Sequence, residues 1–179
     1  GFVGSNIAIY LKKNLKGVKI YSLDNLSRKG SIINRQRLLE HKIKNYRVNI
    51  ENFKNIISLP KFNLVIDCCA EPAIEASDKS PDKVFNTNLV GTFNILKKCI
   101  KDKSNIIFLS SSRVYSIEKL KKLVNHENLK KPIKVQKLID EKFDMLSPCS
   151  LYGFTKLASE KLIQEMFFKK KFKYIINRF

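Results

Sequence analysis

The amino-acid sequence predicts an α/β fold in which helices cover both faces of a doubly wound parallel sheet. Segments with strand character alternate with amphipathic helical segments along the chain, which is the pattern of consecutive βαβ units. Hydrophobic residues make up 44% of the 179 residues, enough for one buried core and too many for a disordered chain. Some strand segments are uninterrupted apolar runs, as expected for parallel strands buried on both faces.

The first half of the chain opens with a helix. Ile7, Leu11 and Leu15 recur at helical spacing over residues 2–15, and Gly17 marks the end of that helix. The run Leu64-Val65-Ile66 predicts a buried strand. The further elements expected in this half are strands at 18–23, 46–50 and 62–70, a helix at about 34–42 and a short helix that stops before Pro60.

A long amphipathic helix over residues 82–101 is the main element expected in the second half, and Ser80-Pro81 is a suitable start for it. A strand follows at 105–109. Residues 117–149 show an irregular pattern with one Lys- and Leu-rich helical piece. The last expected elements are a helix at 150–171 and a strand that begins at Tyr174.

The net charge of +19 indicates either a polyanionic partner or a basic composition without a specific role. The Lys and Arg residues are spread along the whole chain, which favours the second interpretation. A non-catalytic module that binds a polyanion stays an alternative. The sequence lacks the zinc, RNA-recognition and helix-turn-helix signatures of nucleic-acid binders, so no nucleic-acid partner is expected.

Cysteine spacing and hydropathy narrow the remaining classes. The four cysteines include no C-x-x-C pair, which predicts buried thiols and no metal site. No stretch approaches the roughly 18 apolar residues that a membrane span needs, so no membrane partner is expected. We expect no secretory leader, and we therefore expect a reducing, cytoplasmic compartment.

The start of the first helix has the features of a phosphate site. Gly1 and Gly4 let the backbone approach a pyrophosphate, and the helix N-terminus supplies free N–H groups. Asp24, at the end of the next expected strand, is placed to accept hydrogen bonds from adenosine ribose hydroxyls. Its charge favours NAD over NADP, although Arg28 and Lys29 leave NADP open as the minority option.

A tyrosine and a lysine share one face of the helix expected at 150–171. Tyr152 and Lys156 are spaced i, i+4, and a nearby lysine ammonium favours the phenolate form of a tyrosine. Such a tyrosine exchanges a proton with a sugar hydroxyl during hydride transfer. Ser110-Ser111-Ser112 ends a parallel strand, at the sheet edge where ligands bind in open α/β folds.

Five segments, in this order along nearly the whole chain, resemble the extended short-chain dehydrogenase/reductase family, whose members include NAD-dependent nucleotide-sugar epimerases and dehydratases. They are Gly1-Phe2-Val3-Gly4-Ser5-Asn6, Asp24-Asn25-Leu26-Ser27, Asn88-Leu89-Val90-Gly91-Thr92-Phe93-Asn94, Ser111-Ser112-Arg113-Val114-Tyr115 and Tyr152-Gly153-Phe154-Thr155-Lys156. The resemblance implies a Rossmann-like domain with NAD as its cofactor.

The resemblance also implies roles for individual residues. Tyr152 would be the catalytic acid/base, Lys156 its partner and Ser111 the catalytic hydroxyl. Glu71, Ser112 and Arg113 would meet the substrate. The implied cofactor contacts are Gly1, Phe2, Val3, Gly4, Asp24, Asn25, Ser27, Arg28, Asn49, Ile50, Cys69, Ala70, Glu71, Asn88, Tyr152 and Lys156. At Asn49 the family usually has an Asp that contacts adenine.

Within the family, four segments are similar to those of the CDP-paratose (CDP-tyvelose) 2-epimerases. They are Asp24 to Ser31 with Asn34, Ala70-Glu71-Pro72, Ser112 to Ile117 and Ser150 to Gly153. This similarity implies oxidation and re-reduction at C2 of a CDP-sugar. A nucleotide-sugar 4-epimerase or 4,6-dehydratase is the alternative. Dehydratases of the family usually have Asp-Glu after the catalytic hydroxyl residue, where this chain has Ser112-Arg113.

The resemblance further implies that residues 1–179 form a partial NAD-binding domain, truncated at both ends. The family's first strand would precede Gly1, and a C-terminal substrate domain would follow Phe179. We expect these residues to contain the catalytic groups without the part that clamps the nucleotide-sugar. The family often dimerises through the helices that include the Tyr/Lys helix, so a homodimer is expected for the intact protein.

Overall fold

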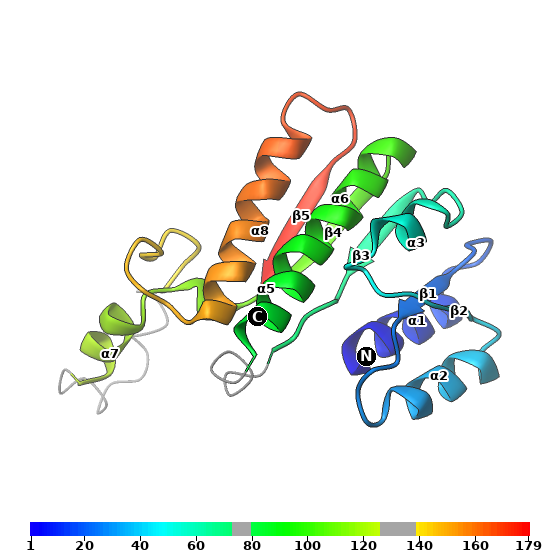
Figure 1. The fold of residues 1–179 in the computed structure, drawn as a ribbon, viewed down its shortest axis with the longest axis horizontal. Helices are drawn as coiled ribbons and strands as arrows, with labels where there is room; N and C mark the ends of the chain where they lie inside the picture. Colours follow the sequence, from blue (N-terminus) through cyan, green and yellow to red (C-terminus); the bar gives the residue numbers. More distant parts are fainter. Residues whose placement is uncertain (73–79, 126–138) are drawn as a thin grey trace.

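The computed structural model describes residues 1–72, 80–125 and 139–179. It confirms the predicted α/β class, because every strand pairing in the described ranges is parallel. The strands form two groups (Figure 1). β1 (Tyr21–Asp24) pairs with β2 (Lys44–Arg47), and β4 (Asn105–Ser110) lies between β3 (Leu64–Asp67) and β5 (Tyr174–Arg178).

Two sets of helices accompany these two sheets. α1 (Phe2–Asn14) and α2 (Ser31–Glu40) pack on each other, α1 against β1 and α2 against β2. α6 (Gly91–Asp102) and α8 (Leu151–Phe167) lie side by side, and α8 packs on β4 and β5 (Figure 1). The shorter helices are α3 (Phe53–Ile57), α5 (Pro81–Phe85), a 3-10 turn at Ser112–Val114 and α7 (Ile117–Asn125).

The long helix predicted over 82–101 is present over residues 81–102, but one turn of it is π-helical, at Asn86–Val90. A wide turn of this kind inserts an extra residue and is frequent at functional sites. Gly91 follows it, and a side chain there would come within 2.6 Å of the Ile50 side chain. Because Gly91 has no side chain, the helix backbone at this position packs directly against Ile50 in the loop after β2.

The strands form two separate parallel sheets. β1 and β3 are not hydrogen-bonded to each other, so each has an edge without a partner strand in the described ranges. The sequence pattern reports that strands and helices alternate, but it does not report which strand edges meet. The division into two sheets is therefore a property of pairing that periodicity cannot show.

The two sheets have cores of different size. The larger apolar cluster joins the loop after β2, α3, β4, α6 and α8. It consists of Ile50, Ile56, Ile95, Leu96, Cys99, Ile106, Phe108, Ile163 and Phe167. The smaller cluster, beneath α1 and α2, consists of Ala8, Ile9, Leu38 and Ile43. Because burial of apolar area is the main stabilising term in folding, the β3–β5 sheet is the more strongly supported.

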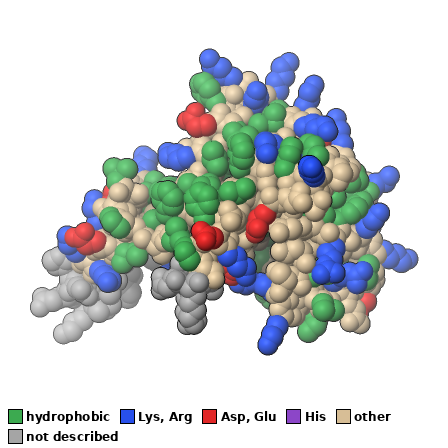
Figure 2. All heavy atoms as spheres, in the orientation of Figure 1, with side chains coloured by type: hydrophobic (Ala, Val, Ile, Leu, Met, Phe, Trp, Pro, Cys, Tyr) green, Lys and Arg blue, Asp and Glu red, His purple; other side chains and the backbone are tan. Residues whose placement is uncertain are grey.

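The surface agrees with the dispersed basic composition. Figure 2 shows Lys and Arg side chains scattered over the face in view, with hydrophobic and acidic groups between them. In the part of the chain that the structure describes, no helix combines the length and the apolar character that crossing a membrane requires.

Candidate active site

Three strand ends bring the predicted site residues to one edge of the molecule. Asp24 ends β1, the segment Cys68–Glu71 follows β3, and Ser111 follows β4. Because the strands within each sheet are parallel, their carboxyl ends share an edge, and this edge is where open α/β folds bind ligands. This edge is therefore the candidate site for a cofactor.

The N-terminus of α1 forms one end of this edge. No side chain caps the helix at Gly1, so the first backbone N–H groups of the helix lack an intrahelical or side-chain acceptor. The backbone nitrogen of Gly1 contacts the Asp24 carboxylate. A Cβ at Gly4 would lie 3.5 Å from the Cys68 Cβ, an ordinary contact, so packing within the chain does not require glycine there. The helix start and the acid at the end of β1 are therefore neighbours.

Glu71 joins the two halves of the edge. Its carboxylate accepts from Arg28 Nη2 at 2.5 Å and pairs with Lys83 Nζ at 2.9 Å. Burial works against the charged form of Glu71, but the hydrogen bonds from Lys83 and Arg28 outweigh it and lower the pKa of the carboxyl group. Arg28, which the sequence left open for an NADP phosphate, is therefore already neutralised by a carboxylate.

Asn88, in the π-helical turn, fastens the Glu71 segment to α8. Its Oδ1 accepts from the Glu71 amide at 2.7 Å, and its Nδ2 donates to the Glu71 carbonyl and to Thr155 Oγ1, each at 3.2 Å. Ser159 Oγ donates to the Asn88 carbonyl at 3.1 Å. Asn88 is almost fully buried, so its predicted cofactor role is indirect in this geometry: it holds the loop that faces the site.

The start of α8 is packed tightly against the segment that carries Ser111. Ser150 caps the helix by accepting from the Gly153 amide at 3.0 Å. A Cβ at Gly153 would lie 2.1 Å from the Arg113 carbonyl oxygen, so only glycine permits this approach. The approach brings the turn after β4, and with it Ser111, beside the first turn of α8, which carries Tyr152.

Lys156 lies one helical turn beyond Tyr152 and is 1% exposed. Its Nζ stands 3.9 Å from the centroid of the Phe108 ring on β4. Burial lowers the pKa of Lys156, and the Asp67 carboxylate works in the opposite direction. The lysine predicted from its spacing to Tyr152 is therefore held inside the protein, against the sheet.

A second buried ion pair fixes α8 to the sheet and was missed from the sequence. Arg178 on β5 donates to both carboxylate oxygens of Glu160, at 2.6 and 3.0 Å, and Ser110 Oγ donates to the same carboxylate at 2.5 Å. Glu160 and Arg178 are 18 residues apart on different elements, so no local spacing signalled the pair. Asp67, a charged residue at the end of the apolar run on β3, was also missed.

The other predicted residues are distributed along the same edge. Asn49 is exposed, and its side chain accepts from the Glu51 amide at 3.1 Å. Ile50 is buried in the larger core, where its side chain faces Gly91. Phe2, Val3, Asn25, Ser27, Ser112 and Arg113 are exposed, whereas Cys69 and Ala70 are half-buried behind Asp67.

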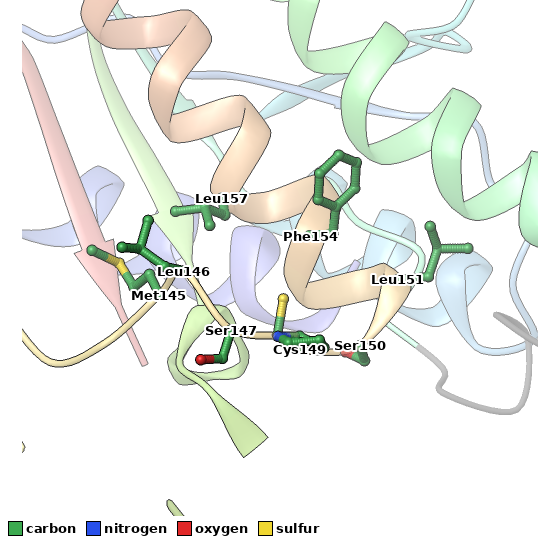
Figure 3. Close-up of a pocket in the computed structure, with 9 residues that line it drawn as sticks. Met145, Leu146, Ser147, Cys149, Ser150, Leu151, Phe154 and Leu157 are labelled. Carbon is green, nitrogen blue, oxygen red and sulfur yellow. The ribbon is translucent and has the colours of Figure 1, made fainter. Parts of the chain in front are cut away.

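Two hollows lie outside this set of residues. One, of about 430 Å³, is formed by the loop before α8 and the first turns of that helix, and Figure 3 shows Leu151, Phe154 and Leu157 of α8 with Met145, Leu146 and Cys149 of the loop around it. The other, of about 720 Å³, lies beside β5 and includes Tyr115, Glu160 and Arg178. Neither hollow is lined by a residue that the sequence predicted to be catalytic.

The family model described as "NAD dependent epimerase/dehydratase family" matches residues 1–179. The chain belongs to this family. Membership confirms the resemblance stated from the sequence. NAD is the cofactor of this family.

Relatives of the family with known names match nearly the whole chain. A dTDP-D-glucose 4,6-dehydratase from Dictyostelium discoideum is 31% identical over 99% of this chain and 41% of its own length. A bifunctional UDP-glucose and UDP-xylose 4-epimerase from Pisum sativum is 26% identical over 93% of this chain and 45% of its own length. The chain thus spans less than half of each of these relatives.

A solved structure shows the same fold. The UDP-Glc/GlcNAc 4-epimerase from Campylobacter jejuni superposes with a TM-score of 0.79 at 23% identity, over 99% of this chain and 50% of that one. At this identity the likeness concerns the fold alone. The named relatives are 4-epimerases and a 4,6-dehydratase, so the specific similarity to CDP-paratose 2-epimerases is not shown by them.

The residues of this epimerase/dehydratase chain fit a dinucleotide. The uncapped start of α1 suits a pyrophosphate, and Asp24 beside Gly1 suits a ribose. Ser111 and Tyr152 lie at the same carboxyl edge, on the far side of the Cys68–Glu71 segment. In the described residues, no three His, Cys, Asp or Glu side chains gather in a group that would hold a metal ion.

Proposed function

We propose that the protein is an NAD-dependent nucleotide-sugar epimerase. The single observation that carries this proposal is the set formed by Ser111, Tyr152 and Lys156 in a chain of the epimerase/dehydratase family. A binding module without catalysis has no need of this set. The absence of an acidic pair after Ser111, where the sequence reads Ser112-Arg113, favours epimerisation over loss of water.

The chain's own groups supply proton transfer and orientation. Tyr152, as phenolate, removes the proton of a sugar hydroxyl and returns it at the end of the cycle. Ser111 donates a hydrogen bond to the same sugar oxygen, and the Lys156 ammonium stabilises the phenolate. The residues at the start of α1 and Asp24 would hold NAD⁺, which when bound would supply a reversible hydride acceptor for the carbon that carries this hydroxyl.

The same proposal assigns the cofactor contacts. The backbone of Gly1 to Gly4 would hold the pyrophosphate and Asp24 the adenosine ribose, with Asn25 and Ser27 beside it. Asn49 would meet adenine. Cys69, Ala70 and Glu71 would line the path of the cofactor, while Arg28 is held by Glu71 and so does not favour NADP.

Two substrates follow from different observations. The local segments around Glu71, Ser112 and Arg113 favour oxidation at C2 of a CDP-sugar, as in CDP-paratose 2-epimerases. The names of the relatives favour C4 of a UDP-sugar. The dehydratase relative gives dTDP-glucose as the third candidate, which the Ser112-Arg113 sequence disfavours on mechanism.

We further propose that the active protein is a longer, dimeric and cytoplasmic one. The unpaired edges of β1 and β3 support one more strand between them, and the greater length of the relatives supports further chain in the active protein. Exposed Phe93 on α6 and Phe154 on α8 support pairing of two copies through these helices. Four free cysteines support a reducing compartment.

The test is a substrate panel with the full-length gene product. UDP-, CDP- and dTDP-hexoses and 6-deoxyhexoses are each incubated without added NAD, and the products are separated by chromatography. We expect interconversion of two epimers of one nucleotide-sugar, with deuterium at the reacting carbon retained. A 4-keto-6-deoxy product would identify a dehydratase instead, and no turnover of any nucleotide-sugar would contradict the proposal.

A further inference from the structure

Asp67 is a buried carboxylate to which the proposed reaction gives no role. It ends β3, is 2% exposed and has Phe108 as its register partner on β4. Its Oδ1 accepts from the Cys69 amide at 2.9 Å, and its Oδ2 is buried without a hydrogen-bond partner in the described ranges. A buried carboxylate oxygen without a partner is costly. Burial raises the pKa of Asp67, whereas the Lys156 charge and the neighbouring polar groups of Cys69 and Thr92 all favour the charged form and lower it.

Phe108 is a neighbour of both the Asp67 carboxylate and Lys156. Lys156 Nζ lies 3.9 Å from the ring centroid, and Asp67 lies beside Phe108 on the neighbouring strand. Both side chains are almost fully buried, and they carry opposite charges. Their interaction is electrostatic and involves no direct hydrogen bond or salt bridge in the described residues.

The other titratable groups around Lys156 do not serve as its counter-ion. Glu160, on the same helix, is already paired with Arg178 through both carboxylate oxygens. Burial raises the pKa of Cys68 to about 12 and raises that of Cys69 as well, so both thiols are neutral at physiological pH. Tyr152 is the group that the lysine itself is proposed to serve.

The two buried groups depend on each other for charge. Burial raises the pKa of Asp67 and lowers that of Lys156, and in each case the partner is the largest opposing influence. In a low-dielectric interior, removal of one member of such a pair leaves the other disfavoured in its charged form. Without Asp67, Lys156 would therefore lose its proton at a lower pH.

We propose that Asp67 is a positioning residue that acts as the counter-ion of Lys156 and keeps its ammonium group charged beside Tyr152. This inference rests on the proposed function for its catalytic meaning, but the pairing of the two side chains stands independently of the reaction. It extends the site from the residues at the sheet edge to one buried on β3. Asp67 itself touches no reacting atom.

The direct test is the titration of Lys156 in the full-length protein. Lysine labelled with ¹³C at Cε reports deprotonation by NMR, and the Lys156 signal is assigned by its loss in Lys156→Arg. In Asp67→Asn we expect the midpoint of Lys156 to fall by about one pH unit or more, which is a tenfold or larger change in its protonation equilibrium. An unchanged midpoint would overturn the proposal.

Asp102→Asn is the matched control. Asp102 is also buried and pairs with a lysine, Lys98, at 2.5 Å, but this pair lies at the C-terminal end of α6. The control removes the same charge and should leave the midpoint of Lys156 unchanged. If the titration midpoint of Lys156 shifted equally in both variants, the effect of Asp67→Asn would be a general loss of packing. That result would overturn the proposal.

Folding and activity give two further arms. If Asp67→Asn alone does not fold, the pairing predicts that Asp67→Asn with Lys156→Met folds, because no uncompensated charge is left; failure of this double variant contradicts it. In active protein, the alkaline limb of the kcat/KM profile should move to lower pH in Asp67→Asn and recover in Asp67→Glu. An inactive wild type would refute the proposed function, while the NMR titration would still decide the pairing.

Discussion

The half of the molecule built on β1 and β2 and the half built on β3, β4 and β5 present their functional groups in opposite ways. In the first half, the predicted cofactor contacts at Phe2, Val3, Asn25 and Ser27 are exposed, above a small apolar cluster. In the second, Lys156 and the groups that hold it are buried over a large core.

The difference follows from what each half has to supply. Binding a pyrophosphate needs accessible backbone N–H groups, which an exposed helix start provides. Proton transfer needs side chains fixed within a fraction of an ångström, which packing and buried hydrogen bonds provide. The comparison predicts that changes in the β3–β5 half alter chemistry and stability together, whereas changes in the β1–β2 half alter cofactor affinity first.

The largest effect is expected from Tyr152→Phe. Removal of the phenolic oxygen eliminates the acid/base group, and we expect turnover by the full-length protein to fall by roughly 10²–10⁴-fold. NAD content after purification, measured by absorbance and mass, should stay at the wild-type level, because the ring is retained. Turnover within a factor of three of wild type would remove Tyr152 from its proposed role.

Glu160→Gln tests the buried support of α8. The substitution leaves Arg178 without its bidentate carboxylate, and breaking a buried pair in this way costs about 3–5 kcal/mol. Chemical denaturation would measure the loss. Lys122 and Glu118, an exposed i, i+4 pair on α7, supply the control: Glu118→Gln should leave the free energy of unfolding close to the wild-type value, because solvent screens this pair. Equal losses of unfolding free energy in Glu160→Gln and Glu118→Gln would contradict the expected difference between the buried pair and the exposed pair.

A pair of leucine truncations compares the two cores. Leu96 is fully buried in the larger cluster, and Leu38 is nearly buried in the smaller one. We expect Leu96→Ala to cost about 4 kcal/mol and Leu38→Ala about 2–3 kcal/mol, because the smaller cluster is better able to relax around the missing atoms. Leu38→Ala should also weaken NAD binding with little change in kcat at saturating NAD; the opposite ranking of stability costs would refute the comparison.

The smallest effect is expected from Glu71→Gln, which removes the charge that holds Arg28 and Lys83. The freed cations should favour the 2′-phosphate of NADP, and we expect the preference for NAD to narrow by about tenfold or less. Because the folded-state pKa of Glu71 is lowered, the stabilisation by these contacts is present above the usual pKa of glutamate and is lost as the pH falls through the folded value.

The control for this change is Glu51→Gln. Glu51 accepts a hydrogen bond from Thr87 and has no ion pair in the described residues, so its loss should leave the ratio of NAD to NADP affinity unchanged. Titration of both cofactors by calorimetry measures the ratio. An unchanged ratio of NAD to NADP affinity in Glu71→Gln would show that Arg28 does not influence which cofactor is bound.

The sequence predicted the order of the main helices and strands, and it predicted that Tyr152 and Lys156 lie on one helix. The spacing of Tyr152 and Lys156 and the charge of Asp24 after a strand are local signals. The structure places Tyr152 and Lys156 on α8, with Lys156 buried against Phe108 of β4, and Asp24 at the end of β1. Asp67 and the Glu160–Arg178 pair were missed because their partners are distant in sequence. No local pattern records which strand edges pair, so the division into two sheets is seen only in the structure.

The central claim is that this chain holds NAD for a reaction in which the cofactor is oxidant and then reductant. The most direct measurement is mass spectrometry of the small molecules released when the full-length gene product is denatured after purification. The account predicts NAD⁺ in near-stoichiometric amount. A protein that releases no dinucleotide, and that instead co-purifies with nucleic acid removed by high salt, would contradict it and make the charge of +19 the main clue to its role.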